Sequence, residues 1–378
     1  MPGRRRTRQL ITVKPVAEPG QHHPAPVVEL LLADRVEYNG VSCRPTTVAP
    51  GPRTSSLWLR LRCRVDRAGD RWQGCVGKAA WRGVGLLDRL AALVGQRGSY
   101  RRVPALRRLR SPKPLVAPVF IVGSPRTGTT ILGTILGCQG DVFFLSEARP
   151  IWFRAVPELD ESRFHWANGE VWGRILLTER DYSDSAKQSL DSDFGKFLRW
   201  SRKKRLMEKF PQNLFRIPWL RAMWPDAKFV QILRDPFSTT ASKAQSWPSI
   251  DEKQLPGVAI RRRMYGELFP QYAALLDSAR TAYEWYLFEW RIDTEMGERL
   301  AAAMPHQLRI VRLEDAQIDP EPFCAGICEF AGLRMTNRLR RAYQTMLNAQ
   351  VRMAKPQLDR ARCIELLGQS AERWGYGF

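Results

Sequence analysis

An apolar run that ends in a glycine-rich turn constrains this chain more than any other feature. Val119–Val122 contains no polar residue and stops at Gly123, as is typical of a strand buried on both faces of a parallel sheet. The turn that follows reads Gly123-Ser-Pro-Arg-Thr-Gly-Thr-Thr130 and leads into a segment with helical spacing of apolar residues. A strand, a glycine-rich turn and a helix in this order can cradle phosphate, because backbone N–H groups converge there and the helix presents its positive end.

Further apolar runs alternate with helical segments after this turn. Three more strands are predicted, each ending at polar residues: 142–145, 229–233 and 308–313. The spacing of apolar residues predicts helices over 129–137, 189–206, 216–224, 265–303, 320–331 and 335–350. This alternation favours an α/β fold with a doubly wound parallel sheet and a P-loop-like phosphate-binding turn. Ligands of such sheets lie at the carboxyl ends of the strands, where the polar residues of this chain follow.

The chain begins with a basic extension whose composition differs from the rest. Residues 1–115 hold 23 Lys and Arg against 7 Asp and Glu, a net charge of +16 out of +22 for the whole chain. We interpret 1–26 as a disordered basic tail, 27–114 as an N-terminal extension of unknown type with a linker, and 115–378 as the α/β domain. Within the extension, the alternation in Leu57–Val65 predicts a strand. The arginines are scattered and accompany no recognisable nucleic-acid module, which favours a solvated extension over nucleic-acid binding.

The sequence gives no sign of a membrane span or a secretion leader. Arg4-Arg5-Arg6 are followed by no apolar stretch of leader length, and the apolar segment 115–123 is too short to cross a bilayer. The seven cysteines form no C-x-x-C pair, which argues against a zinc ribbon. We therefore expect a cytoplasmic protein without a transmembrane segment, and the sequence leaves its oligomeric state open.

A second candidate anion-binding element follows the strand 229–233. Arg234 stands at the strand end, and Ser242 lies two turns into the next helix, so that a guanidinium and a hydroxyl can close on one phosphate. A structural pair between Arg234 and Asp235 is the alternative. Two anion loops at two strand ends suit a ligand with two separated phosphate groups. A kinase or NTPase loop would carry Lys where this chain has Thr129, which argues against Mg-dependent ATP chemistry.

The octapeptide of the turn resembles the 5′-phosphosulfate loop of sulfotransferases that use 3′-phosphoadenosine-5′-phosphosulfate (PAPS). Their pattern is Pro, then Lys or Arg, then Ser or Thr, then Gly-Thr-Thr. The resemblance implies that the 5′-phosphate and the sulfuryl group are held by Arg126, Thr127, Gly128, Thr129 and Thr130. It also implies that Arg234 and Ser242 bind the 3′-phosphate, and that 115–378 is a sulfotransferase domain.

Two departures from the cytosolic branch of that family are visible. Ile131 stands where many cytosolic members carry a Trp that stacks on adenine, and their Arg-Lys-Gly-x-x-Gly loop is not evident. The chain is therefore more similar to the carbohydrate, tyrosylprotein and bacterial branches. The sequence does not identify the residues that contact adenine.

The resemblance also implies residues that activate the acceptor. Glu147-Ala148-Arg149 is similar to the Glu-x-Arg of tyrosylprotein sulfotransferases, so Glu147 is the candidate general base. Lys209 matches the family's Lys-x-Pro, and its ammonium suits the leaving phosphate oxygen. A structural salt bridge for Glu147 and a surface position for Lys209 are the alternatives, and His165 is a second candidate base. Arg216 is read as supporting structure.

The leading hypothesis is a metal-independent transfer of a sulfuryl group from PAPS to a hydroxyl acceptor. We expect the acceptor to be a small molecule, a carbohydrate or a lipid. A tyrosyl peptide is a further alternative. Trp166, Trp172 and Trp247 can line an acceptor pocket or belong to the core. The alternatives are a P-loop kinase or NTPase and a non-catalytic protein that binds anions or nucleic acid.

Overall fold

The computed structural model describes residues 36–38, 41–47, 59–65, 111–347 and 353–377. The chain divides into two compact units, residues 1–71 and 72–378. The first unit contains an antiparallel sheet in the order β1-β2-β3, formed by β1 (Val36–Tyr38), β2 (Val41–Thr47) and β3 (Leu59–Val65). The strand expected over 57–65 corresponds to β3. The predicted disordered tail, 1–26, lies outside the described residues.

The second unit is built on a five-stranded parallel sheet in the order β10-β9-β4-β8-β5. The strands are β4 (Val119–Gly123), β5 (Val142–Ser146), β8 (Arg205–Lys209), β9 (Lys228–Leu233) and β10 (Leu308–Arg312). From the central strand β4 the chain builds β5 and β8 on one side and then crosses to β9 and β10 on the other. The predicted doubly wound parallel sheet is thus confirmed. The carboxyl end of β4 lies where the winding direction changes, which is where such sheets bind ligands.

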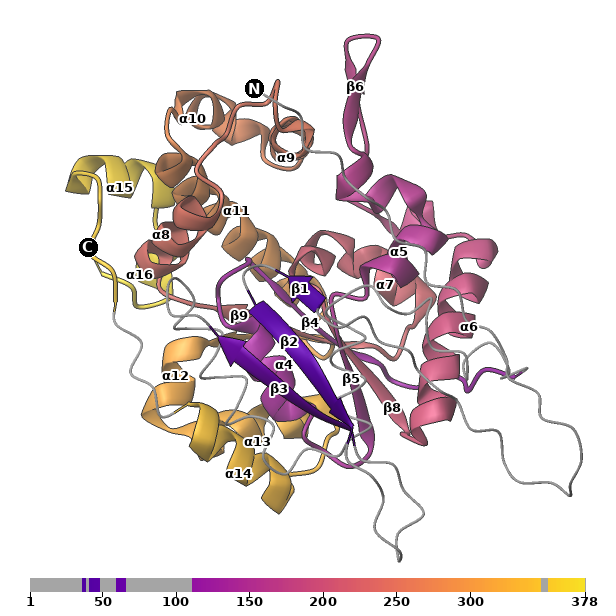
Figure 1. Ribbon diagram of the computed structural model, residues 1–378. Helices are drawn as coiled ribbons and strands as arrows, with labels where there is room; N and C mark the ends of the chain where they lie inside the picture. Colours follow the sequence, from indigo (N-terminus) through magenta and orange to yellow (C-terminus); the bar gives the residue numbers. More distant parts are fainter. Residues whose placement is uncertain (1–35, 39–40, 48–58, 66–110, 348–352, 378) are drawn as a thin grey trace, which may run out of the picture. The chain divides into compact units, whose positions relative to one another are not determined.

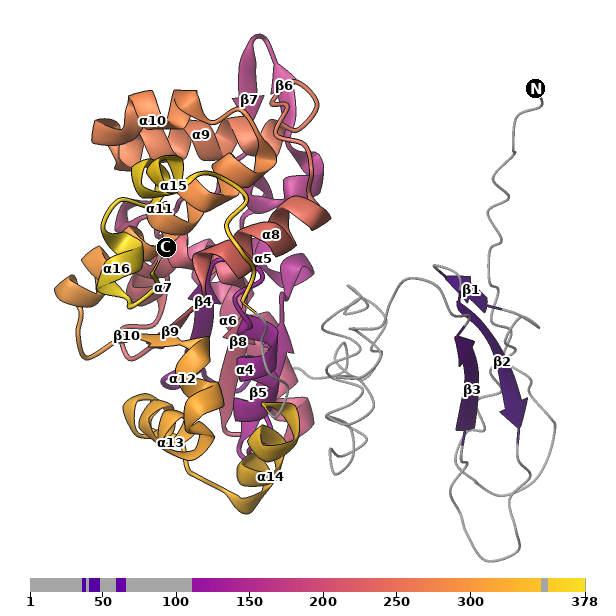
Figure 2. The same cartoon turned by 90° about the vertical axis from the view of Figure 1, so that its left-hand side faces the viewer.

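Apolar side chains of β4 alternate between two cores, one on each face of the sheet. Val119 and Ile121 belong to the first core, with side chains of α4 (Thr129–Leu136), α13 (Pro320–Ala331) and α14 (Asn337–Met346). Phe120 and Val122 belong to the second core, which is larger. The helices that contribute to it are α5 (Arg149–Ala155), α6 (Asp184–Ser201), α7 (Ile217–Met223), α9 (Pro256–Leu268), α11 (Ala282–Ala303) and α15 (Arg360–Leu367). Figures 1 and 2 show the two groups of helices on separate sides of the sheet.

Two predicted helices differ from the structure. The helix expected over 189–206 ends earlier, because Arg202 takes a left-handed conformation (φ 58°) and caps α6, and the chain then enters β8. The helix expected over 265–303 is broken into α9, a short turn at Pro270, α10 (Ala273–Ser278) and α11. Proline cannot continue the backbone hydrogen bonds of α9, and Thr281 with Glu284 forms a capping box that starts α11 anew.

The remaining elements frame the carboxyl edge of the sheet. A hairpin of β6 (His165–Ala167) and β7 (Glu170–Trp172) projects from this unit, as Figure 1 shows. The other elements are the 3-10 helices η2 (Pro157–Leu159), η3 (Glu161–Arg163), η4 (Glu179–Asp181) and η5 (Pro211–Arg216) and the helices α8 (Pro236–Ser246), α12 (Leu313–Ile318) and α16 (Ser370–Arg373). Among the described residues, no helix combines the length and the apolar character that a bilayer crossing requires.

Candidate active site

The phosphate turn between β4 and α4 is held open by two glycines in conformations that other residues rarely adopt. Gly123 has φ +131° and Gly128 has φ +93°. A Cβ at Gly123 would lie 2.9 Å from the Ile232 carbonyl oxygen, and a Cβ at Gly128 would lie 3.0 Å from the Leu313 side chain. Both positions therefore require glycine. Arg126, between them, also has a left-handed backbone (φ 74°), a strained conformation that is common at functional sites.

The hydroxyl groups of the turn divide into buried and exposed ones. Thr127 is fully buried and donates from Oγ1 to the Ser124 carbonyl oxygen over 2.7 Å, which closes the turn on itself. Thr129 is also buried, whereas Arg126 and Thr130 are exposed. The exposed pair and the first turn of α4 are therefore accessible to an anion.

The predicted second anion element meets the phosphate turn directly. Arg126 donates from Nε to Ser242 Oγ over 2.8 Å, and Arg234 donates from Nη1 to the Arg126 carbonyl oxygen over 3.2 Å. Residues 116 positions apart in the sequence thus lie in one cluster. Their elements adjoin, since β9 pairs with β4 along its whole length. The two candidate anion-binding elements form a single site.

Arg234 carries hydrogen-bonding capacity that the protein does not use. Its Nε is buried and has no hydrogen-bond partner within the described part of the chain. Burial lowers the pKa of Arg234, and the neighbouring Arg126 guanidinium adds to this effect. Two guanidinium groups held this close favour a multiply charged anion between them. The residues of this site therefore fit a phosphate-bearing ligand.

The loop that carries Arg234 is fixed by bonds from two other parts of the chain. The Asp235 backbone N–H donates to Glu314 Oε1 over 2.8 Å, and the Tyr376 hydroxyl donates to Glu314 Oε2 over 2.7 Å. Trp290 Nε1 donates to the Arg234 carbonyl oxygen over 2.9 Å. Asp235 also caps α8 by accepting from the Ser238 N–H. The guanidinium of Arg234 is thus presented by a rigid loop.

Glu147 and Lys209 lie together at the ends of neighbouring strands. Glu147 follows β5, has a left-handed backbone (φ 52°), and donates its N–H to the Lys209 carbonyl oxygen over 2.7 Å. The Lys209 ammonium donates to Glu147 Oε1 over 2.6 Å, and Arg149 Nη2 lies 3.1 Å from Glu147 Oε2. Lys209 is almost fully buried, whereas a third of the Glu147 side chain is exposed. The candidate base is therefore accessible, and its candidate partner lies beneath it.

The two cations beside Glu147 set its protonation. Burial by itself raises the pKa of Glu147, but the charges of Lys209 and Arg149 outweigh this, and the pKa lies below its ordinary value of 4.5. Glu147 is therefore ionised at neutral pH and can accept a proton or a hydrogen bond from a hydroxyl.

Glu208, the residue before Lys209, is fully buried and contacts Trp152 of the larger core. It accepts hydrogen bonds from the Ala148 N–H, from Trp152 Nε1 and from Asn213 Nδ2. Burial raises the pKa of Glu208 to about 7, although the hydrogen bonds from Trp152 and Ala148 act in the other direction. Arg216 is also fully buried and donates to the Ile175 carbonyl oxygen and to Asn213 Oδ1. Glu208 thus holds the backbone next to Glu147, and Arg216 holds Asn213, which is a partner of Glu208.

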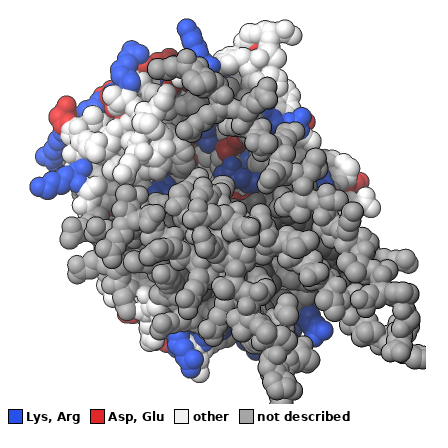
Figure 3. Space-filling view, viewed as in Figure 1, with Lys and Arg blue, Asp and Glu red and all other residues white. Residues whose placement is uncertain are grey.

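A series of ion pairs extends from Glu147 through Arg149 to charged residues that the sequence did not point to. Arg149 Nη1 lies 3.1 Å from Glu161 Oε2, and Arg261 Nη2 lies 3.2 Å from Glu161 Oε1. Arg261 Nε in turn lies 3.4 Å from Glu289 Oε1. Figure 3 shows acidic and basic side chains side by side in the middle of the face it presents. The ion pairs join side chains from α5, η3, α9 and α11.

This series of ion pairs reaches the phosphate turn through Lys243. Lys243, the residue after Ser242 in α8, donates to Glu289 Oε2 and to Ser124 Oγ, both over 2.6 Å. Asp293, one helical turn after Glu289, lies 3.9 Å from the same ammonium. A local signal for this cluster existed in the sequence, because Glu289 and Asp293 are carboxylates within the mostly apolar stretch that forms α11.

His165, Trp166 and Trp172 lie on the projecting hairpin, whereas Trp247 lies at the end of α8. His165 is exposed, its Nδ1 is 2.8 Å from the Arg163 carbonyl oxygen, and its ring stacks on Trp172 at 5.4 Å. Trp166 is 43% exposed and donates from Nε1 to the Glu252 carbonyl oxygen over 3.1 Å. Trp247 is 47% exposed. These aromatic residues therefore belong to the surface, outside the two cores.

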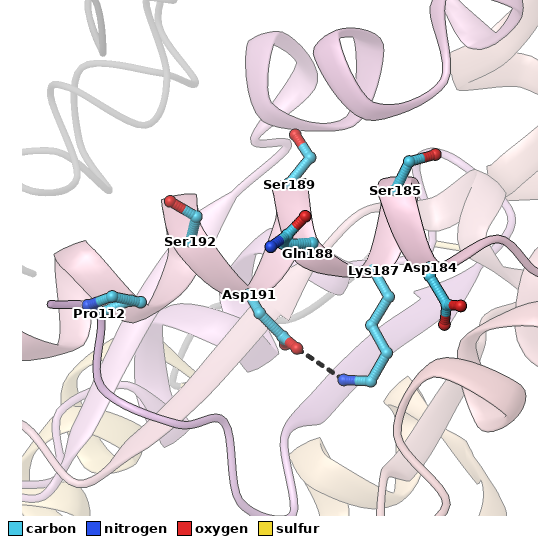
Figure 4. Close-up of a pocket in the computed structure, with 8 residues that line it drawn as sticks. All are labelled: Pro112, Asp184, Ser185, Lys187, Gln188, Ser189, Asp191 and Ser192. Atoms are coloured by element: carbon cyan, nitrogen blue, oxygen red, sulfur yellow. Dashed lines mark hydrogen bonds and ion pairs between the residues drawn. The ribbon is translucent and has the colours of Figure 1, made fainter.

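An open pocket of about 830 Å³ lies elsewhere, along α6. Figure 4 shows its lining, which comes from Pro112 and one side of α6 and includes the ion pair between Lys187 and Asp191. None of the candidate site residues lines this pocket. It is therefore separate from the cluster around Arg126.

The fold and the site define an α/β protein with a glycine-rich turn and an arginine cluster at the carboxyl end of its parallel sheet. Residues 118–337, more than half of the chain, match the family described as "Sulfotransferase family". The chain belongs to the sulfotransferase family.

Individual relatives are distant. The nodulation protein NoeE of Sinorhizobium fredii is 27% identical over 157 residues, which are 39% of this chain and 35% of that protein. An uncharacterised protein of Aquifex aeolicus is 22% identical over 240 residues, 61% of this chain and 28% of that protein. The chain thus spans about a third of the length of these curated relatives. The crystal structure of sulfotransferase STF9 from Mycobacterium avium is 16% identical, with 79% of this chain and 84% of that chain covered and a TM-score of 0.43.

Proposed function

We propose that this protein transfers a sulfuryl group from PAPS to a hydroxyl group of an acceptor, without a metal ion. The observation that carries the proposal is the convergence of Arg126, Arg234 and Ser242 at the carboxyl end of the sheet. Because β4 lies between β9 and β8, Arg234 and Lys209 flank the phosphate turn from its two sides. A doubly phosphorylated nucleotide on one side and an acceptor on the other suit this arrangement.

The nucleotide-binding residues follow from their chemistry. Arg126, Gly128, Thr129 and Thr130, with the first turn of α4, would hold the 5′-phosphate end, and Thr127 would keep the turn in shape through Ser124. Arg234 and Ser242 would hold the 3′-phosphate, since a rigid guanidinium fork and a hydroxyl suit a terminal phosphate. When bound, PAPS supplies the sulfuryl group and the leaving phosphate oxygen.

Glu147 would act as the general base. Its carboxylate is ionised and partly exposed, so it can accept the proton of an acceptor hydroxyl that binds beside it. Lys209 would place positive charge where negative charge develops on the leaving oxygen. Arg149 would keep the Glu147 carboxylate oriented through its contact with Oε2. The side chains themselves thus provide the positive charge that this chemistry requires.

Turnover of PAPS tests the proposal. The protein would be incubated with PAPS and a panel of alcohol, sugar, lipid and phenol acceptors, and release of 3′-phosphoadenosine-5′-phosphate (PAP) would be followed by chromatography. We expect acceptor-dependent release that does not require Mg²⁺. Hydrolysis of ATP in the presence of Mg²⁺, with no release of PAP from PAPS, would instead identify a kinase or NTPase.

A further inference from the structure

Lys243 lies in a position where a lysine is costly. Its side chain is 1% exposed, beneath the phosphate turn, and none of the roles given above uses it. Removing an ammonium group from water is unfavourable unless partners compensate for it fully. The partners are Glu289 Oε2 at 2.6 Å, Ser124 Oγ at 2.6 Å and the Tyr286 ring at 5.5 Å.

The carboxylates around Lys243 are themselves held in place. Glu289 Oε1 accepts from the Tyr265 hydroxyl over 2.7 Å and lies 3.4 Å from Arg261 Nε, so both of its oxygens are engaged. Asp293 lies 3.9 Å from the ammonium, one helical turn further along α11. Buried ion clusters of this kind contribute little net stability and are often replaceable by apolar residues. A role other than stability therefore accounts better for this cluster.

The contact with Ser124 indicates that role. Ser124 is the residue that follows Gly123, and its carbonyl oxygen accepts the hydroxyl of Thr127. Lys243 thus reaches the start of the turn through Ser124 Oγ, whereas the adjacent residue, Ser242, accepts from Arg126 in the middle of the turn. Two consecutive residues of α8 therefore hold the phosphate turn at two points.

We propose that Lys243, anchored by Glu289 and Asp293, is a positioning residue that fixes the phosphate turn for nucleotide binding by way of Ser124. This inference rests on the proposed function, because it assumes that the turn binds a nucleotide. Lys243 is almost fully buried, and its ammonium is engaged by Glu289 and Ser124, so its effect on a nucleotide would pass through the turn. It links the helix that carries Ser242 to the strand end that carries Arg126, so that both anion-binding elements keep one relative arrangement.

A double-mutant cycle tests this route of action. The variants are Ser124→Ala, Lys243→Met and the double variant, and the readout is the dissociation constant of PAP measured by calorimetry. We expect about a tenfold loss of affinity for Ser124→Ala and about a 30-fold loss for Lys243→Met, in the range of interaction energies that coupled residues show. The double variant should bind only about as weakly as Lys243→Met, because both substitutions break the same contact.

Two further variants separate positioning from folding. Lys243→Arg keeps a positive charge next to Glu289 and should restore part of the lost affinity. Lys187→Met, a substitution of a lysine in the ion pair on α6, serves as the matched control and should leave PAP binding unchanged. Ser124→Ala removes one hydroxyl only, so it keeps the test meaningful if Lys243→Met fails to fold.

The possible outcomes distinguish this inference from the proposed function. If wild-type protein does not bind PAP, the proposed function fails, and the inference fails with it. If wild-type protein binds PAP and Ser124→Ala binds it equally well, the inference is wrong while the proposed function stands. Losses that multiply in the double variant would also overturn the inference, because they would show that Lys243 acts independently of Ser124.

Discussion

The Lys209 ammonium lies 2.6 Å from Glu147 Oε1, which joins the candidate base to the candidate stabiliser of the leaving group. Both side chains come from the carboxyl ends of adjacent parallel strands, β8 and β5, and this pairing of strand ends fixes their separation. In this arrangement Lys209 keeps Glu147 ionised. If an oxygen of the nucleotide draws the ammonium away, Glu147 becomes a stronger base, because burial then dominates its pKa.

This relationship predicts a pH dependence. The acid limb of kcat/KM reports the pKa of the base in the free enzyme, so in the wild type it should lie below the ordinary value of 4.5. Lys209→Met removes the largest charge that lowers this pKa and leaves the burial that raises it. We expect the acid limb of the variant to move upward by about 1–2 pH units, the usual effect of one close opposite charge. A limb that does not move would show that Glu147 is not the titrating base.

Glu147→Gln should separate catalysis from binding. The substitution keeps the shape of the side chain and removes its ability to take a proton. We expect kcat to fall on the order of 10²–10⁴-fold, the usual contribution of a general base, with the affinity for PAP nearly unchanged. Glu170→Gln, at an exposed position on the hairpin, is the matched control and should retain full activity. A near-normal rate in Glu147→Gln would direct attention to His165.

Arg234→Ala should weaken nucleotide binding. The substitution removes a guanidinium whose Nε has no protein partner among the described residues, and it also removes the Nη1 contact to the Arg126 carbonyl oxygen that holds the phosphate turn. We expect a loss of about 1.5–3 kcal/mol in the free energy of PAP binding, the usual contribution of a hydrogen bond to a charged group. Arg221→Ala, at an exposed position in α7, provides the comparison. Equal affinities for the two variants would contradict the role given to Arg234.

The raised pKa of Glu208 implies that the free energy of unfolding depends on pH. Its pKa is raised to about 7 in the folded protein against 4.5 for the ordinary group, so the folded state binds this proton more tightly than the unfolded state. The contribution of Glu208 to stability therefore falls as pH rises between these two values. From pH 5.5 to pH 8 the loss amounts to roughly 2 kcal/mol, and Glu208→Gln should abolish it. Urea unfolding of both proteins at the two pH values measures this difference, and identical pH profiles would contradict the assignment.

The sheet and the phosphate turn were predictable because their signals are local. The apolar runs of β4 and β9 and the glycines that follow β4 can be read within a few residues of each other. The same applies to Arg234 and Ser242, which lie two helical turns apart. The structure places them beside Arg126, where the sequence analysis expected one shared site.

Strand β8 and the cluster around Lys243 were missed for physical reasons. β8 reads Arg-Leu-Met-Glu-Lys, and its buried charged residues Glu208 and Lys209 remove the apolar pattern that identifies a strand. The contacts of Lys243 join residues 46 and 119 positions apart, and only the folded topology brings such residues together. The breaks between α9 and α11 depend on Pro270 and on the capping box at Thr281, which are signals that a long helical periodicity obscured.

Calorimetric titration of PAP into the wild-type protein, Arg126→Ala and Arg234→Ala shows whether the two arginines hold one nucleotide. We expect one binding event per chain with a dissociation constant on the order of 1–10 μM, weakened roughly tenfold or more by each substitution. Absence of binding to the wild type at micromolar concentrations would contradict a nucleotide site at this cluster. So would a binding event that only one of the two arginines affects, because the two guanidinium groups would then not share one ligand.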